Sequence, residues 1–289
     1  MGDRDVVAAW FEPRRSAYPW RGERDPYRVL VSEVMLQQTQ VARVVPAYRL
    51  FLERFPDVST LASASRAEVI RTWGNLGYNR RAVALWGAAR TRVRDHGGRF
   101  PPDPAALRGL PGVGPYTAAA VASLAFGVPV PTLDTNARRV VARARLGREP
   151  HDVAPRALHA EAASWLDRRD PGSWNQALMD LGRDVCRPAP RCGECPLAAG
   201  CRFHGSGRQG VPDRRRTEPY EGSRRQARGR VVAVLRTRRS ASMRALASST
   251  GLAPESLAAV VGGLVADGLV AAGPAALAGR PSGRVRLAG

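Results

Sequence analysis

The stretch from Arg108 to Asn136 (RGLPGVGPYTAAAVASLAFGVPVPTLDTN) constrains the fold more than any other part of the chain. Gly112 and Gly114 allow a sharp turn between two short helices and let another group approach the backbone closely. Pro115 suits the first position of the second helix, whose small apolar residues can be buried. Backbone N–H groups at such a helix N-terminus bind anions, most simply a DNA phosphate. The pattern predicts a helix-hairpin-helix.

Asp134 lies downstream of this hairpin, in a Pro-bounded segment that opens the next helix. A carboxylate near a bound phosphate is a candidate reactive group. Asp is also a preferred N-cap residue, so Asp134 would equally serve as a helix cap alone. Spacing leaves both interpretations open.

The net charge and the type of basic residue narrow the function. The chain has 289 residues, a formal charge of +20 and 24% charged residues. A positive excess of this size in a chain with enough apolar residues for a core indicates a nucleic-acid partner. All 45 basic residues are arginines. Lysine Schiff-base chemistry is therefore excluded, apart from the N-terminal amine. No transmembrane run or signal peptide is present, so we expect a cytoplasmic protein without a membrane partner.

Glu33 interrupts an apolar surface on the first long helix. Asp25 and Pro26 form a good start for this helix, which we expect to run from 26 to about 45. Apolar stripes flank Glu33 on both sides. A carboxyl against apolar neighbours has a raised pKa and can donate a proton. A solvated charge is the alternative.

The rest of the body is expected to be helical, with no strand before Cys201. Between two of these helices, the loop GNLGYN carries Leu76 and Tyr78, which either enter a base stack or are buried. The expected helices span residues 1–17, 46–54, 66–73, 80–95, 137–146, 155–166 and 173–184.

Four cysteines follow in the pattern C-x5-C-x2-C-x5-C: Cys186, Cys192, Cys195 and Cys201. In a cytoplasmic protein, clustered thiols indicate a metal site rather than disulfides. A four-thiolate zinc site and a [4Fe–4S] cluster both fit this set.

The C-terminal part changes character. Residues 202–230 are rich in Arg, Gly, Gln and Pro, and include Arg214-Arg215-Arg216. We interpret them as a basic linker that follows the DNA backbone or is merely solvated. The last sixty residues suggest helices at 230–237, 242–249 and 254–264 followed by a hairpin, as in a winged helix. The third of these helices is poor in basic residues, which argues against major-groove binding by it.

Together, the hairpin, Asp134 and the cysteines resemble the helix-hairpin-helix DNA glycosylase superfamily. Four motifs are similar to those of MutY-type adenine DNA glycosylases, in the same order over about residues 20–201. They are EVMLQQTQV from Glu33, WGNLGY from Trp73, LDTN from Leu133 and NQALMDLG from Asn175.

The resemblance implies an all-α endonuclease III-like body with a small C-terminal α+β unit. A six-helix barrel domain with the helix-hairpin-helix would span 21–130, and an iron–sulfur cluster domain would combine 1–20 with 131–204. A basic linker over 205–229 and a winged-helix-like domain over 230–289 complete the chain. The cysteines would then hold a structural [4Fe–4S] cluster, with zinc as the alternative.

The resemblance also assigns roles. Glu33 would protonate a flipped adenine and later activate water, while Asp134 would stabilise the sugar cation, with Asn136 beside it. The bases to be bound are adenine and the 8-oxoguanine or guanine opposite it, in double-stranded DNA. The residues expected near the adenine are Arg21, Tyr116 and Gln176, and those around the opposite base are Gln38, Thr39, Leu76 and Tyr78.

Tyr116 separates the candidate activities. Endonuclease III-like relatives carry a lysine at this position for lyase chemistry, so a tyrosine implies a monofunctional glycosylase, expected to be monomeric. The alternatives are an endonuclease III-like enzyme on damaged pyrimidines or T:G mismatches, and a non-enzymatic iron–sulfur DNA-binding regulator. A regulator would have no reason to carry Glu33 and Asp134 in these motifs.

Three features depart from the family pattern. The first cysteine gap is five residues where the family usually has six, so the cluster loop is rearranged or less stable. Asn79 replaces a common second tyrosine after Tyr78. The usual C-terminal domain that helps to recognise 8-oxoguanine is missing, which puts the preference for that base over guanine in doubt.

Overall fold

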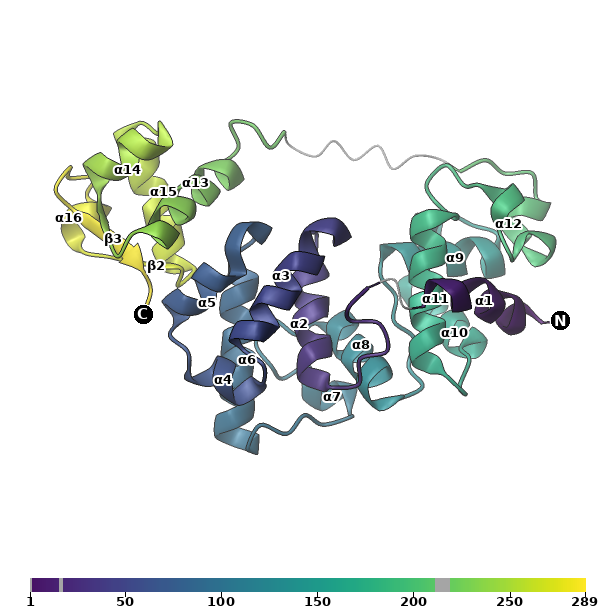
Figure 1. Cartoon of the computed structure of the whole chain (residues 1–289). Coiled ribbons are helices and arrows are strands. Elements are labelled where there is room, and N and C mark those ends of the chain that lie inside the picture. Colours follow the sequence, from purple (N-terminus) through teal and green to yellow (C-terminus); the bar gives the residue numbers. More distant parts are fainter. Residues whose placement is uncertain (1, 16–17, 211–218) are drawn as a thin grey trace. The chain divides into compact units, whose positions relative to one another are not determined.

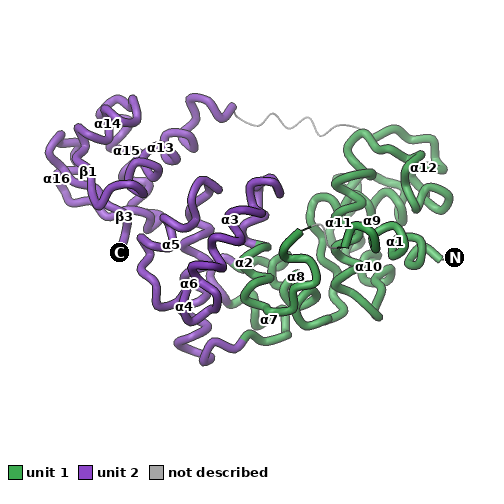
Figure 2. The backbone as a smooth tube through the Cα atoms, viewed as in Figure 1, with its two compact units in different colours: residues 1–33, 100–109, 113–215 green, residues 34–99, 110–112, 216–289 purple. Residues whose placement is uncertain are grey.

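The computed structural model describes residues 2–15, 18–210 and 219–289. The chain (Figure 1) divides into two compact units, which Figure 2 shows in different colours: Met1–Glu33, Phe100–Gly109 and Val113–Arg215 form the first, and Val34–Arg99, Leu110–Gly112 and Arg216–Gly289 the second. The described residues before Ala241 contain no strand, which confirms the predicted all-α body. The run Arg214–Arg216, predicted to follow DNA, lies outside the described residues.

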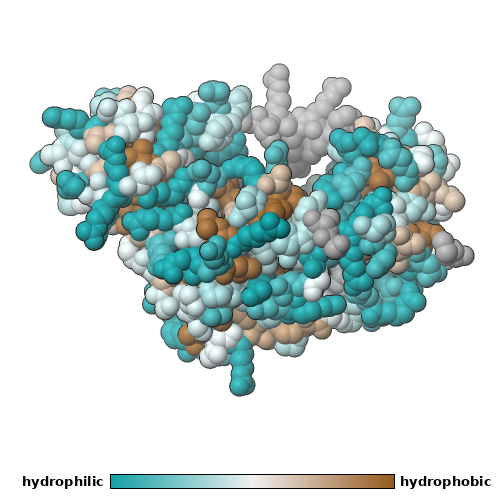
Figure 3. All heavy atoms as spheres, in the orientation of Figure 1, coloured by the Kyte–Doolittle hydropathy of each residue, from teal (hydrophilic) through white to brown (hydrophobic). Residues whose placement is uncertain are grey.

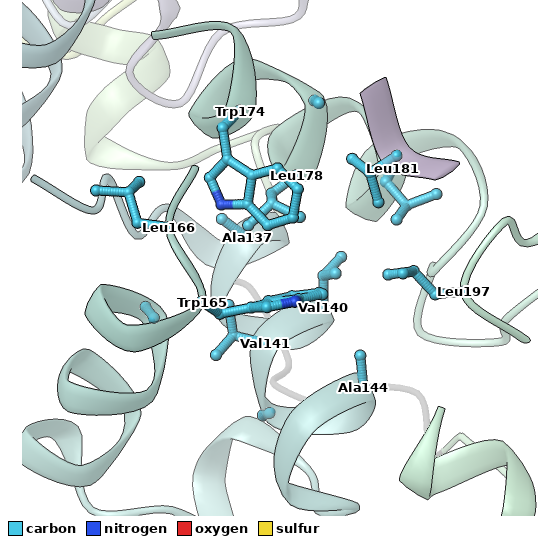
Figure 4. Close-up of a cluster of buried hydrophobic side chains, with 14 of the residues drawn as sticks. Ala137, Val140, Val141, Ala144, Trp165, Leu166, Trp174, Leu178, Leu181 and Leu197 are labelled. Carbon is cyan, nitrogen blue, oxygen red and sulfur yellow. The ribbon is translucent and has the colours of Figure 1, made fainter. Parts of the chain in front are cut away.

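The first unit is a helical bundle around a core of buried apolar residues. Within this core, the rings of Trp165 and Trp174 meet edge to face, with centroids 5.1 Å apart (Figure 4). Its helices are α1 (Asp3–Phe11), the first part of α2 (Pro26–Leu36), α7 (Pro104–Leu107), α8 (Pro115–Phe126), α9 (Thr135–Leu146), α10 (Pro155–Trp165), α11 (Pro171–Asp184) and α12 (Arg202–Gly205). Short 3-10 turns lie at Glu12–Arg14, Pro150–Asp152, Cys192–Glu194 and Ala198–Gly200.

Helices α9 and α11 approach each other very closely at Gly182. A Cβ atom at this position would lie 2.6 Å from the carbonyl oxygen of Asn136 on α9. Any side chain at this position would therefore push the two helices apart. This close approach is important because α9 carries Asp134 at its N-terminus.

The predicted hairpin is present between α7 and α8. Gly112 has a left-handed backbone (φ 74°), and a Cβ atom there would lie 2.6 Å from that of Ala84. Only glycine fits. A Cβ atom at Gly114, by contrast, would meet nothing within 4 Å, so the space beside this residue is open. Pro115 begins α8, and Gly127 ends it in the left-handed conformation, as predicted.

The prediction of one helix from 26 to about 45 is wrong, because α2 ends at Leu36 and α3 (Val41–Arg54) begins at Val41. The break falls at polar residues, where Gln38 adopts φ 52°. The start predicted at Pro46 is also wrong, since this proline lies inside α3. The guanidinium of Arg81 stabilises this break. It donates hydrogen bonds to carbonyl groups at the end of α2, which in a continuous helix would accept hydrogen bonds from backbone N–H groups of the next turn.

The second unit joins four helices of the body to the C-terminal region. Its body elements are α3, α4 (Val58–Ser63), α5 (Arg66–Trp73), a 3-10 turn at Gly74–Leu76 and α6 (Arg80–His96). Its C-terminal elements are α13 (Arg224–Thr237), β1 (Ala241–Ser242), α14 (Met243–Thr250), α15 (Pro254–Ala266), β2 (Val270–Ala272), α16 (Pro274–Leu277) and β3 (Arg284–Leu287). The sheet is antiparallel with the order β1-β3-β2.

Helix α13 begins at Arg224, six residues before the predicted start at Arg230, because Ser223 caps it by accepting a hydrogen bond from the backbone N–H of Gln226. The C-terminal core includes Ile70 of α5, so this region packs on the body. No single helix in the described residues is long and apolar enough to cross a membrane. Among these residues, only α14 and α15 taken together reach the required length and apolar composition, and they are bent by 106°.

Candidate active site

Glu33 lies on α2 and is buried, with only 6% of its surface exposed. Burial raises its pKa from an ordinary 4.5 to about 7, and the nearby charge of Asp134 acts in the same direction. A hydrogen bond with Tyr116 and the charge of Arg21 oppose this rise. About half of the Glu33 carboxyls would therefore be protonated at neutral pH, which suits a general acid.

Tyr116 occupies the first turn of α8, directly after the hairpin. Its hydroxyl is buried and hydrogen-bonded to the Glu33 carboxyl, and it also lies 3.8 Å from the sulfur of Met179. Burial and the two carboxyls, Glu33 and Asp134, hold the pKa of Tyr116 well above its ordinary value. Tyr116 is therefore a neutral hydrogen-bond partner of Glu33.

Asp134 is both a helix cap and a member of this acidic site. One carboxylate oxygen accepts a hydrogen bond from the Ala137 N–H at 2.6 Å, and the other accepts one from the Asn136 amide at 3.2 Å. Burial raises the pKa of Asp134, whereas these hydrogen bonds favour the ionised form. The two interpretations of Asp134 that were open in the sequence are thus compatible.

No role was predicted for Arg139 from the sequence, although its guanidinium holds Asn136, which donates a hydrogen bond to Asp134. Its guanidinium donates to the side-chain oxygen of Asn136 at 2.9 Å and to the Gly182 carbonyl at 2.6 Å. It also donates to the carbonyl of Cys186 at 2.6 Å. Asp134, Asn136 and Arg139 therefore form a hydrogen-bonded chain that reaches the first cysteine. Nothing in the arginine-rich sequence of α9 distinguishes this residue from its neighbours.

Arg21 enters the site paired with Asp180 of α11. One guanidinium nitrogen lies 2.7 and 2.8 Å from the two carboxylate oxygens, and both side chains are buried. Arg183 binds the same carboxylate at 2.8 Å. Asp180 was not singled out, although it belongs to the NQALMDLG motif. Gln176, predicted near the adenine, is buried on the same helix.

Asn175, on α11, positions the segment that leads to Asp134. Its side-chain oxygen accepts a hydrogen bond from the Thr132 N–H at 3.0 Å. Its amide donates to the Ser123 hydroxyl at 2.8 Å and to the Val130 carbonyl at 2.9 Å. Asn175 thereby anchors the extended stretch between α8 and α9. Its role here is structural.

The four cysteines, Cys186, Cys192, Cys195 and Cys201, line one small cavity of the first unit together with Arg143 and Phe203. A guanidinium nitrogen of Arg143 lies 3.8 Å from the Cys186 sulfur. Burial and the other thiols raise the pKa of Cys195 to about 11. A metal or cluster bound in this cavity would require the thiols to lose their protons.

The residues predicted around the opposite base lie in the second unit. Gln38 and Tyr78 are the two described non-glycine residues with positive φ, 52° and 46°. Backbone strain of this kind is typical of functional sites. Tyr78 is exposed. Leu76 is 5% exposed, so it would have to move before it could enter a base stack.

Arg81 holds both strained turns and was also missed. It donates to the carbonyls of Val34, Met35 and Gln37, to the Thr39 hydroxyl at 3.0 Å and to the Gly77 carbonyl at 3.2 Å. Burial lowers its pKa to about 10, which leaves it charged at neutral pH. The side chain connects the turn around Gln38 to the loop of Tyr78.

Two separate comparisons agree with this fold. Residues 31–164 match the HhH-GPD superfamily of base excision DNA repair proteins. The structure resembles a thermostable thymine-DNA glycosylase with a TM-score of 0.65 and 30% identity, over 70% of this chain and 94% of that one. A trapped endonuclease III–DNA intermediate, 23% identical, shares the fold with a TM-score of 0.60 over 70% of this chain and 94% of that one.

Sequence relatives identify the branch of this superfamily. The adenine DNA glycosylase of Mycolicibacterium smegmatis is 40% identical over 94% of this chain and 95% of its own length. The enzyme of Mycobacterium tuberculosis is 44% identical over 80% of this chain and 77% of its own length. The human enzyme is 40% identical over 69% of this chain and 39% of its own length. The chain belongs to the adenine DNA glycosylase family. This confirms the resemblance seen in its motifs.

Proposed function

We propose that this protein removes adenine opposite 8-oxoguanine or guanine in double-stranded DNA by hydrolysis of the N-glycosidic bond. The observation that carries the proposal is the buried pair Glu33 and Asp134 in a chain of this family, with the hydroxyl of Tyr116 hydrogen-bonded to Glu33. Family membership accounts for adenine as the base removed. The two environments account for a division of labour between the acids.

Hydrolysis then follows from the protonation states. The target adenine leaves the base stack and enters the buried site. Glu33, protonated, gives its proton to a ring nitrogen of adenine as the bond to the sugar breaks, and the bonding electrons leave with the base. The Asp134 carboxylate stabilises the positive charge on the sugar. Water then adds to the sugar carbon and returns a proton to Glu33, which leaves an abasic site.

The absence of lysine limits the reaction to this step. Strand cleavage by a Schiff base requires an amine, and Tyr116 instead offers a neutral hydroxyl at the corresponding place. We expect the abasic strand to stay intact until alkali or heat is added. The endonuclease III-like activity on damaged pyrimidines is the competing function that this property argues against.

The four cysteines, Cys186, Cys192, Cys195 and Cys201, would hold a [4Fe–4S] cluster. They line the wall of one cavity, so the four thiolates are available to one bound group. The family resemblance favours a cluster, and a four-cysteine zinc site is the alternative. A bound cluster supplies structural cross-linking of the loop, and Arg143 and Arg139 bind this loop from α9.

DNA is the partner that the charge and the hairpin support. Hydrophilic side chains are spread over the face seen in Figure 3, among paler and hydrophobic areas, and the formal charge is +20. The open space beside Gly114 at the N-terminus of α8 suits a phosphate, which backbone N–H groups would bind. Gln38, Thr39 and Tyr78, with Leu76 after a movement, would surround the opposite base. We propose a monomer that acts in the bacterial cytoplasm, with the domain boundaries expected above.

Single-turnover excision tests this proposal. Duplexes with A:8-oxoG, A:G, T:G and an oxidised pyrimidine are incubated with excess enzyme, with and without alkali. Adenine release dominates if the proposal holds, and strand breaks appear only after alkali. Pyrimidine release without adenine release would contradict it. Visible absorption with iron and sulfide analysis of fresh protein tests the cluster separately, because a colourless protein that contains zinc rejects it.

A further inference from the structure

A large cavity lies within the second unit, where α13 and α15 of the C-terminal region face the turn of Gln38 and the loop of Tyr78. Its volume is about 790 Å³, within the range of ligand sites. Five of its lining residues are arginines and one is an aspartate. These residues are Arg80, Arg81, Arg224, Arg225, Arg228 and Asp267.

The charges of this wall are only partly compensated. Asp267 pairs with Arg228 and lies 3.4 Å from Arg80, so one carboxylate serves two guanidinium groups. Arg81 points inward to backbone carbonyls. Arg224 and Arg225 are exposed, and neither has an ion pair with the residues that the structure describes. The wall of the cavity therefore carries an excess of positive charge.

Arg225 is tied to the predicted base-reading loop. It donates a hydrogen bond to the Tyr78 hydroxyl at 2.8 Å, and its guanidinium lies 5.8 Å from the centre of that ring. The hydrogen bond uses one of its N–H donors and leaves the others free for a ligand. Gly263 of α15 makes room for Arg224, because a Cβ atom there would come within 3.2 Å of its guanidinium.

We propose that this cavity binds a backbone phosphate of the DNA strand that carries the base opposite the adenine, through Arg224 and Arg225 of α13. The C-terminal region then binds DNA with its first helix, not with α15, which is poor in basic residues. This proposal rests on the proposed function, because that function places Gln38 and Tyr78 at the opposite base. Exposed arginines around a cavity of this size suit a phosphodiester.

The first test measures the salt dependence of binding. An Arg224→Gln/Arg225→Gln double variant is compared with Arg286→Gln, which removes an exposed arginine from β3 of the same region. Binding to an A:8-oxoG duplex is followed by fluorescence anisotropy over roughly 50 to 200 mM salt in a Glu33→Gln background. The plot of log K against log salt has a negative slope. This slope should become less steep by about 0.9 for each phosphate that the double variant no longer binds. If the slope becomes less steep with Arg286→Gln but not with the double variant, the proposal is overturned and strand β3 is the part that binds the phosphate.

The second test identifies the strand. Neutral methylphosphonate linkages replace single phosphates near the mispair, on either strand. A neutral linkage beside the opposite base should weaken binding of the parent protein but have no further effect on the double variant. Linkages on the adenine strand should weaken both proteins equally. Additive effects at every position would reject the site.

Failure of the proposed function remains distinguishable from failure of this site. Adenine release from the same duplexes by the wild-type protein tests the function alone. If wild type releases no adenine while the double variant still shows the smaller salt slope, the function fails and the site stands. If adenine is released and the salt slopes are equal, the site fails and the function stands. Thermal unfolding of the variants checks that they fold.

Discussion

The active site of the first unit and the arginine-lined cavity of the second use charge in opposite ways. Glu33, Tyr116 and Asp134 are withdrawn from water, and their chemistry depends on burial. Arg224 and Arg225 are exposed and lie on the wall of the cavity. The formal charge of +20 therefore serves DNA binding. Catalysis depends instead on a few buried acids.

The two regions should therefore respond to different conditions. Salt screens exposed charges over about 10 Å at 0.1 M, and it acts far less on buried groups. Proton concentration, in turn, changes the charge of Glu33 near pH 7. Raising salt should weaken DNA binding without changing the chemical step. The largest effects are expected from the buried acids, and the smallest from the groups that only adjust them.

Glu33→Gln should cause the largest loss of activity. Glutamine keeps the shape and can hydrogen-bond, but it has no proton to donate to adenine. General acids contribute about 10²- to 10⁴-fold, so single-turnover excision should fall by that factor while affinity for mispaired DNA is retained. Glu12→Gln, the same change at an exposed site of the first unit, is the control. Normal excision by Glu33→Gln would remove Glu33 from the mechanism.

Asp134→Asn should lower the excision rate by about 10²- to 10³-fold, the usual effect of removing one electrostatic interaction with a transition state. Asparagine caps a helix as well as aspartate, so α9 should keep its stability. Asp134→Ala should lose the cap as well and unfold with about 1 kcal/mol less free energy. If both variants excise adenine at the wild-type rate, Asp134 is only a cap.

The raised pKa of Glu33 predicts an effect on stability. The folded-state pKa of about 7 lies above the ordinary 4.5, so the carboxyl contributes stability below pH 4.5 that is lost as the pH rises to 7. The loss corresponds to about 3 kcal/mol. Urea unfolding of Glu33→Gln should therefore show greater stability than wild type at pH 8 and equal stability near pH 4. Equal curves at both pH values would mean that Glu33 is hydrated.

How far the sequence predicts these regions follows from the range of the interactions. Glu33 stands out because an acid breaks an apolar stripe on its own helix, and Gly112 because a turn needs it. Arg81 and Arg139 do not, since their acceptors are carbonyls of distant segments. Among 45 arginines, no local pattern marks the buried ones. For the same reason, the sequence pattern did not predict the helix break after Leu36, where Arg81 binds the last carbonyls of α2.

Arg81→Met should affect the second unit alone. Methionine fills much of the same volume, but the carbonyls of Val34 and Met35 lose their donor, and the turns of Gln38 and Tyr78 lose their common support. We expect affinity for A:8-oxoG duplex to fall by about tenfold, or ~1.4 kcal/mol. The rate at saturating enzyme should stay near wild type. Arg90→Met, exposed on the same helix, is the control; an equal loss there would assign the effect to charge.

Tyr116→Phe should give the smallest change, and its direction is informative. The Tyr116 hydroxyl donates to the Glu33 carboxylate and so lowers the pKa of that acid. Without it, Glu33 should hold its proton to higher pH, and the decline of the excision rate above neutrality should shift in the same direction. The rate at low pH should change by less than about tenfold, since no transferred proton is removed. Tyr48→Phe, a buried tyrosine of the second unit, should leave the profile in place. A shift to lower pH would mean that Tyr116 stabilises the protonated acid, so that its hydroxyl accepts a hydrogen bond from Glu33 and does not donate one.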